Sequence, residues 1–260
     1  MLAAGYNERM ASEKTQAIVL RVVEFSETSL VVTLFTEDFG KIGALAKGAR
    51  RPKGPFEGAL DLLALVRIVF LRKSSDALDL LTEAKLWRRF RSAQRDLSRL
   101  YAGYYVAELL SELTDNGDPH PELFALADET LLALDTGGPV APAVLRFELA
   151  ALRLLGHAPS LAECVGCGRT VEGSGRVPFG LTAGGVLCPQ CRPGQRQVAS
   201  ASSEVIATLR RFADVQGEAW RELTIDNRIR GELRGLWNNY LTHLVGHKLR
   251  MHEFLGSLAH

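Results

Sequence analysis

The sequence predicts an α+β protein with two domains, a small N-terminal β-barrel and a helical C-terminal domain that carries a metal-binding insertion. Three observations predict this: five short apolar runs occupy the first third of the chain, the apolar period becomes helical after Ala84, and the four cysteines form two Cys-x-x-Cys pairs. At 260 residues the chain is long for a single core, so two domains are the natural expectation.

Four segments are expected along the chain. Residues 1–14 are polar and without periodicity, which is typical of a flexible tail. A barrel domain is expected over residues 15–84 and a helical domain over residues 85–260, with the metal module inserted at residues 160–198.

The barrel is predicted from five runs rich in Val, Ile, Leu and Thr that are separated by turn residues. They cover residues 17–23, 30–35, 41–46, 62–71 and 78–82. The longest connection follows the third run. This order fits a five-stranded barrel of the oligonucleotide-binding (OB) type, with an SH3-like barrel as the alternative.

The helical domain is predicted from apolar residues that recur every three or four positions. The first such stripe runs from Leu97 to Leu113 and stops at the polar turn of residues 115–119. Further helices are expected over residues 121–135, 142–155, 203–212 and 228–250. The cysteines lie between the helices expected over residues 142–155 and 203–212, in a segment that is expected to be rich in turns.

The cysteine pairs have the spacing of a closed tetrahedral zinc site. Its ligands would be Cys164, Cys167, Cys188 and Cys191. Four sulfur ligands leave no position for water, so one structural Zn²⁺ is expected rather than a catalytic one. Two disulfides are the alternative. They are disfavoured because the chain starts without an apolar signal segment, and thiols in the cytosol stay reduced.

The charges are separated into blocks although the net charge is only +1. Residues 41–99 hold fourteen basic and six acidic side chains, whereas residues 100–150 hold one basic and nine acidic. Such a distribution favours a nucleic-acid surface on the first block, or attraction between the two blocks across a domain contact. No apolar run is long enough to cross a bilayer, and a cytoplasmic protein is expected.

Two basic clusters are the candidate DNA-binding residues. The first combines cations with glycines that allow close approach to phosphates: Lys41, Lys47, Arg50, Arg51 and Lys53. The second would form a cationic line on one helix face, where a solvated face is the alternative: Arg88, Arg91, Arg95 and Arg99. Phe39 and Phe56 flank the first cluster and could stack on bases or cap the barrel.

The sequence contains no recognisable catalytic constellation. His120-Pro-Glu122 with Cys188-x-x-Cys191 resembles the zinc site of nucleobase deaminases, but that site uses three ligands and a water. Here two further cysteines would complete the coordination. There is no phosphate-binding Walker motif and no Gly-x-Ser-x-Gly elbow, so a protein that is not an enzyme is expected.

Several motifs together resemble the bacterial recombination mediator RecO family. They are the run from Ala17 to Leu30, the segment Ala46-Lys-Gly-Ala-Arg-Arg51, Leu80-Leu-Thr-Glu-Ala84, Gly117-Asp-Pro-His-Pro-Glu-Leu123, Arg146-Phe-Glu-Leu-Ala150, Leu155-Gly-His-Ala-Pro159 and the cysteine pairs. The resemblance spans about residues 15–255 and keeps the order of the family.

The resemblance implies a mediator of DNA repair with an OB domain, a helical domain and often a zinc finger. Such proteins bind single- and double-stranded DNA, anneal complementary strands without ATP, and act with RecR and the single-stranded DNA-binding protein to load RecA. It maps the family's zinc ligands onto the four cysteines and its basic segment onto residues 47–51. A protein-only adaptor and a zinc-dependent nucleic-acid enzyme are the rival hypotheses.

Overall fold

The computed structural model describes residues 12–52, 54–56, 58–73, 77–92, 96–172, 175–215 and 217–255. Lys53, Arg95 and the first eleven residues of the expected tail lie outside these ranges. The chain divides into two compact units, one formed by residues 1–90 and 114–128 and the other by residues 91–113 and 129–260. Helix α2 (Pro121–Asp135) begins in the first unit and ends in the second.

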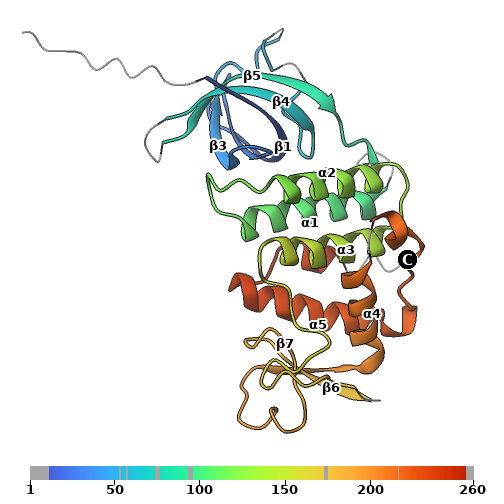
Figure 1. The fold of residues 1–260 in the computed structure, drawn as a ribbon. Helices are drawn as coiled ribbons and strands as arrows, with labels where there is room; N and C mark the ends of the chain where they lie inside the picture. The colour runs from blue at the N-terminus through green and yellow to red at the C-terminus, as the bar shows by residue number, and fades with distance from the viewer. Residues whose placement is uncertain are drawn as a thin grey trace, which may run out of the picture. The chain divides into compact units, whose positions relative to one another are not determined.

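The first unit is a closed five-stranded barrel in the strand order β1-β2-β3-β5-β4 (Figure 1). Its strands are β1 (Ser12–Glu24), β2 (Leu30–Thr36), β3 (Gly40–Ala46), β4 (Leu65–Leu71) and β5 (Asp79–Arg88). Strand β1 closes the barrel because it pairs with β4 through its first half and with β2 through its second half. All pairs are antiparallel except β3 with β5.

The barrel interior is filled by alternate residues of each strand. In β3, for example, Ile42, Ala44 and Ala46 are buried, while the residues between them are partly exposed. Phe56, from the connection between β3 and β4, is only 3% exposed and belongs to this core. The structure therefore supports a role of Phe56 in closing the barrel and not in stacking on bases.

Gly40, the first residue of β3, is placed where only glycine fits. Its φ angle is +66°, and a Cβ atom there would lie 2.1 Å from the main-chain oxygen of Asp118. The next residue, Lys41, accepts a hydrogen bond of 2.9 Å at its main-chain oxygen from the Gly117 amide. The loop that precedes α2 is thereby held against the start of β3.

The second unit combines helices with a small sheet (Figure 1). Besides the end of α2 it contains α1 (Leu97–Leu113), α3 (Val140–Leu154), α4 (Ser203–Asp214), the 3-10 helix η2 (Gly217–Glu222), α5 (Asn227–Val245) and α6 (His252–Leu255). Helix α3 contacts α1, α4 and η2, and nine of its fifteen residues are buried. It is the central helix of this unit. No helix among the described residues is both long and apolar enough to cross a membrane.

The structure corrects three expectations about the elements and adds a small sheet to the turn-rich cysteine segment. Strand β1 starts at Ser12, inside the expected tail, and β5 continues to Arg88 instead of ending near Thr82. The cysteine segment is not only turns, since β6 (Arg176–Gly180), β7 (Gly185–Val186) and β8 (Val198–Ser202) form a sheet. The last long helix ends at Val245, because Gly246 adopts the left-handed conformation with φ +88°.

Candidate metal centre and nucleic-acid interface

The four cysteines lie on two tight turns that face each other in the second unit. In the first turn the Gly168 amide donates to the Cys164 oxygen at 2.8 Å, and in the second the Arg192 amide donates to the Cys188 oxygen at 3.0 Å. Gly168, which follows the first pair, has a φ of +72°, in the left-handed region that favours glycine. Each turn therefore directs both thiols of its pair to the same side.

The sulfur atoms form a group of the size that a metal ion requires. All four cysteines are free, and their Sγ atoms lie within 4.8 Å of one another, with 3.8 Å between those of Cys167 and Cys188. Four sulfurs at about 2.3 Å from a tetrahedral zinc would lie roughly 3.8 Å apart. The donor set and the spacing thus fit a metal ion with four thiolate ligands.

The surroundings of the thiols favour the thiolate form of Cys164. Its burial raises the pKa, but backbone amides that point at its sulfur, first that of Cys188 at 3.2 Å, more than offset this and lower the pKa to about 6. Hydrogen bonds with the Cys167 and Cys188 sulfurs raise the pKa of Cys191 to about 12, because the thiols share protons. The buried Cys164 thiol is therefore readily deprotonated, and the thiolate is the form that binds a metal ion.

The metal centre is attached to the small sheet by main-chain and apolar contacts. The Val165 amide donates to the Val186 oxygen of β7 at 3.0 Å, and Leu187 packs with Cys164 and Cys188 in a buried cluster. Gly166 allows the two turns to approach, since a Cβ atom there would lie 3.0 Å from the Cβ of Cys191. With four sulfur ligands the centre is suited to holding the sheet together and not to activating water.

Three residues of the first basic cluster, Lys47, Arg50 and Arg51, lie in the turn after β3 and are exposed. This turn is formed by Gly48, with φ +73°, whose oxygen accepts from the Arg51 amide at 3.0 Å. Arg50 forms an ion pair of 3.0 Å with Glu24, and the two side chains are 41% and 72% exposed. Lys47 and Arg51 are exposed, and within the described part of the chain no carboxylate pairs with either. Three cations are thus presented to solvent on one loop.

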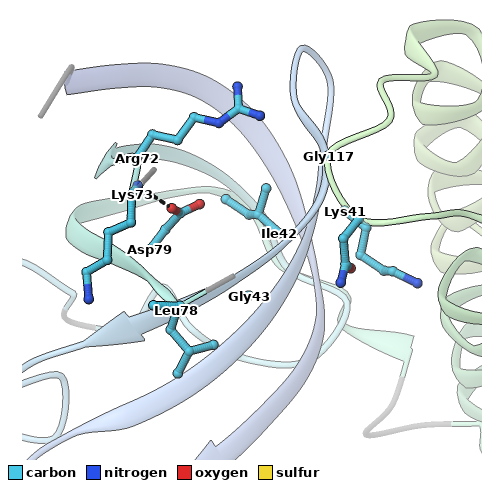
Figure 2. Close-up of a pocket in the computed structure, with 10 residues that line it drawn as sticks. Lys41, Ile42, Gly43, Arg72, Lys73, Leu78, Asp79 and Gly117 are labelled. Atoms are coloured by element: carbon cyan, nitrogen blue, oxygen red, sulfur yellow. Dashed lines mark hydrogen bonds between the residues drawn. The ribbon is translucent and has the colours of Figure 1, made fainter. Parts of the chain in front are cut away.

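Lys41 lies away from this loop and lines a pocket of about 420 Å³ in the first unit (Figure 2). Its ammonium group donates to the Thr114 main-chain oxygen at 2.6 Å. The pocket is also lined by Arg72 and Lys73, which follow β4, and by residues 116 and 117 before α2. Arg72 and Lys73 are not among the predicted DNA-binding residues, although two adjacent cations directly after a predicted strand are a usable signal.

The second basic cluster does not form a helix face. Because β5 continues to Arg88, this residue is at a strand end, where it pairs with Asp128. Arg91 is exposed and outside any helix. Arg99 is in α1 of the other unit and donates to the Leu134 and Gly138 oxygens at 2.9 and 2.8 Å. The expected shared face is therefore wrong, and contact of these residues with DNA stays a prediction.

Comparison with known proteins identifies related chains over nearly the whole length. The family model described as "Recombination protein O N terminal" matches residues 10–90, and "Recombination protein O C terminal" matches residues 94–253. A protein of Rhodopirellula baltica named DNA repair protein RecO is 47% identical over 92% of this chain and 97% of its own length. Proteins of the same name from Anaeromyxobacter dehalogenans and Symbiobacterium thermophilum are 35% and 32% identical, each over 96% of this chain and 98% of their own. The chain belongs to the RecO family.

Proposed function

We propose that this chain is a DNA-binding recombination mediator of DNA repair and not an enzyme. The observation that carries the proposal is the exposed loop of Lys47, Arg50 and Arg51 beside β3 of a closed barrel. The names of the relatives, which are DNA repair proteins, support the same role. Because phosphates are bound mainly by Lys and Arg, such a loop would bind single- and double-stranded DNA without regard to sequence.

We further infer that the barrel is of the OB type. Its support is the strand order, in which β1 pairs with both β2 and β4 and the parallel pair β3–β5 completes the barrel. OB barrels bind oligonucleotides on the face of their second and third strands and neighbouring loops. Strand β3 and the basic loop that follows it would then form part of this face.

The mechanism follows from charge neutralisation and needs no ATP. Two DNA strands repel each other, and a protein whose cations neutralise both backbones lowers this barrier while counterions are released. Annealing of complementary strands is the expected result. By the same proposal the protein acts with RecR to load RecA on DNA that is covered by single-stranded DNA-binding protein.

The metal would be one structural Zn²⁺ held by Cys164, Cys167, Cys188 and Cys191. The donor set of four thiolates and the sulfur spacing support zinc, which such ligands bind with tetrahedral geometry. Its role would be to stabilise the module of residues 160–198 and not to contact DNA.

The experiment is DNA binding and strand annealing measured across salt concentration without nucleotide. Reversing Arg50 and Arg51 to Glu should weaken binding to all sequences, and the slope of log K against log salt should fall by roughly 0.7 for each single-strand phosphate that is no longer neutralised. A matched control reverses Arg153 and Arg211, which are exposed in the second unit, and changes the net charge equally. Unchanged affinity of the Arg50/Arg51 variant at low salt would refute the proposal, and a wild-type protein without salt-dependent binding would favour a protein-only adaptor.

A further inference from the structure

The pocket that Lys41 lines lies beside the short ladder between β3 and β5. Strands β3 and β5 pair only through Ala44–Ala46 and Asp79–Leu81, which leaves the first half of β3 outside that ladder. The pocket is lined on one side by this half of β3 and on the other by residues at the two ends of the β4–β5 connection and by Asp79, the first residue of β5 (Figure 2). A gap in the strand pairing therefore becomes a concave site.

The walls of the pocket combine cations with apolar surface. Arg72 and Lys73 contribute charge, and the Arg72 guanidinium lies 5.9 Å from the ring centroid of Phe39, which itself packs edge-on against the core residue Phe70. Leu78 contributes apolar surface, since it is 38% exposed although it is a large aliphatic residue, whereas the Ile42 side chain beneath the pocket is buried in the barrel core. A ligand with one anionic and one flat apolar part would match both kinds of wall.

Polar groups are also fixed at the margin of the pocket. The Asp79 carboxylate accepts a hydrogen bond of 2.9 Å from the Lys73 amide, shown as a dashed line in Figure 2, which fixes its position. Asn116 adds a side-chain amide, which can both donate and accept. Such groups can bind the hydrogen-bonding edge of a nucleobase.

Gly43 keeps the pocket open. A Cβ atom at this position would lie 3.0 Å from the Cδ2 atom of Leu78, so any side chain there would occupy the space between β3 and Leu78. Because Gly43 is in a regular strand and its φ is not positive, a larger residue can be accommodated there by movement of the flexible Leu78 side chain. The pocket can therefore be filled without changing any charge.

We propose that this pocket binds one unpaired nucleotide of single-stranded DNA, with its phosphate toward Arg72 and Lys73 and its base against Leu78. A volume of about 420 Å³ is within the range of small-ligand sites, roughly 300–1,000 Å³. A base in a duplex can enter only after unstacking and unpairing, which cost free energy. The pocket would thus distinguish single from double strands, whereas the exposed loop of Lys47, Arg50 and Arg51 binds the phosphates of both. The inference rests on the proposed DNA-binding function.

The test compares three variants by their affinity for a short oligothymidylate and for a duplex of equal length. Arg72→Ala/Lys73→Ala removes the pocket cations, Gly43→Val fills the pocket without a change of charge, and Arg50→Ala/Arg51→Ala is the control that removes two cations from the loop. We expect both pocket variants to lose about tenfold in single-strand affinity, with the duplex affinity within about twofold of wild type. The loop control should lose affinity for both DNA forms. A Gly43→Val protein should also keep the wild-type salt slope.

The possible results distinguish a failure of the pocket inference from a failure of the proposed DNA-binding function. If both pocket variants bind single strands as wild type does, or weaken single and double strands equally, the pocket inference is overturned while DNA binding stands. If wild type binds neither form, the proposed function fails and the inference with it. Thermal melting of each variant shows whether it is folded, and if Gly43→Val does not fold, the Arg72→Ala/Lys73→Ala pair decides alone.

Discussion

Arg234 of α5 binds Glu148 of α3 through two hydrogen bonds, from its Nη1 and Nη2 atoms to the two carboxylate oxygens at 2.9 and 2.8 Å. The Glu148 side chain is completely buried, and the Tyr105 hydroxyl of α1 donates to the same carboxylate at 2.5 Å. Burial raises the pKa of Tyr105 well above its usual value, and the neighbouring carboxylate raises it further. Three helices of the second unit are thus joined by one buried, charged network.

Replacing Glu148 by Gln should strongly destabilise the second unit. The change leaves the Arg234 guanidinium in the interior without a counter-charge, and breaking a buried pair in this way costs about 3–5 kcal/mol of the free energy of unfolding. Urea denaturation followed by circular dichroism measures the loss. The control is Glu253→Gln, which breaks the exposed pair of Glu253 with Lys248 and should leave the denaturation midpoint unchanged. Equal midpoints for both variants would contradict a stabilising role of the network.

His252 should make the protein less stable in acid. Burial, followed by the nearby charges of Arg234 and Lys248, lowers its pKa to about 4, and its Nε2 atom meets no hydrogen-bond partner among the described residues. Between pH 6.5 and 4 the unfolded chain therefore takes up a proton that the folded chain does not, so stability falls as the pH falls. Above pH 6.5 the group is neutral in both states. Wild type should lose stability over this interval more steeply than His252→Leu does.

His247 provides a control of opposite sign for the pH experiment. A hydrogen bond to the Lys248 oxygen, and then one of 3.1 Å to Glu112, raise the pKa of this exposed imidazole. Its contribution is present at low pH and is lost as the pH rises through the raised pKa. The variant His247→Gln should therefore lose stability below neutrality relative to wild type. If both histidine variants show the same pH dependence as wild type, these assignments are wrong.

Removing the metal should lower thermal stability more than DNA affinity. A strong zinc chelator should lower the melting temperature by at least about 5 °C, and added Zn²⁺ should restore it, because four-thiolate sites contribute directly to folding. Elemental analysis of the purified protein should find one zinc per chain. The double variant Cys164→Ala/Cys188→Ala is the control, since it should melt early and not respond to the chelator. An equally stable variant that no longer binds DNA would instead make the zinc module a direct DNA contact.

The candidate metal centre could be predicted from the sequence because each of its two cysteine turns is local and their combination is typical of a four-cysteine zinc site. Two residues between the cysteines of a pair permit only a tight turn, and the structure confirms that all four sulfurs lie together. The five strands of the barrel were also predictable, since their apolar runs and turns are adjacent in sequence. Their ends were not, because β5 is extended to Arg88 by pairing with β4, which no local pattern of the sequence records.

Which cations are available to bind a ligand depends on the groups around them, and the tertiary structure determines those groups. Arg99 and Arg51 are equally basic in the sequence, yet Arg99 donates to carbonyl oxygens at the end of α2 and beyond, while Arg51 is exposed on a glycine turn. Residue types and spacing by themselves determined the metal ligands, the barrel strands and the basic loop. The Cys-x-x-Cys spacing marks ligands although the two pairs are twenty residues apart, while the strands and the loop depend on neighbours a few positions away. Only the tertiary structure placed Lys41, Arg72 and Lys73 around one pocket, because β3, the end of β4 and the loop before α2 meet through pairing between distant parts of the chain.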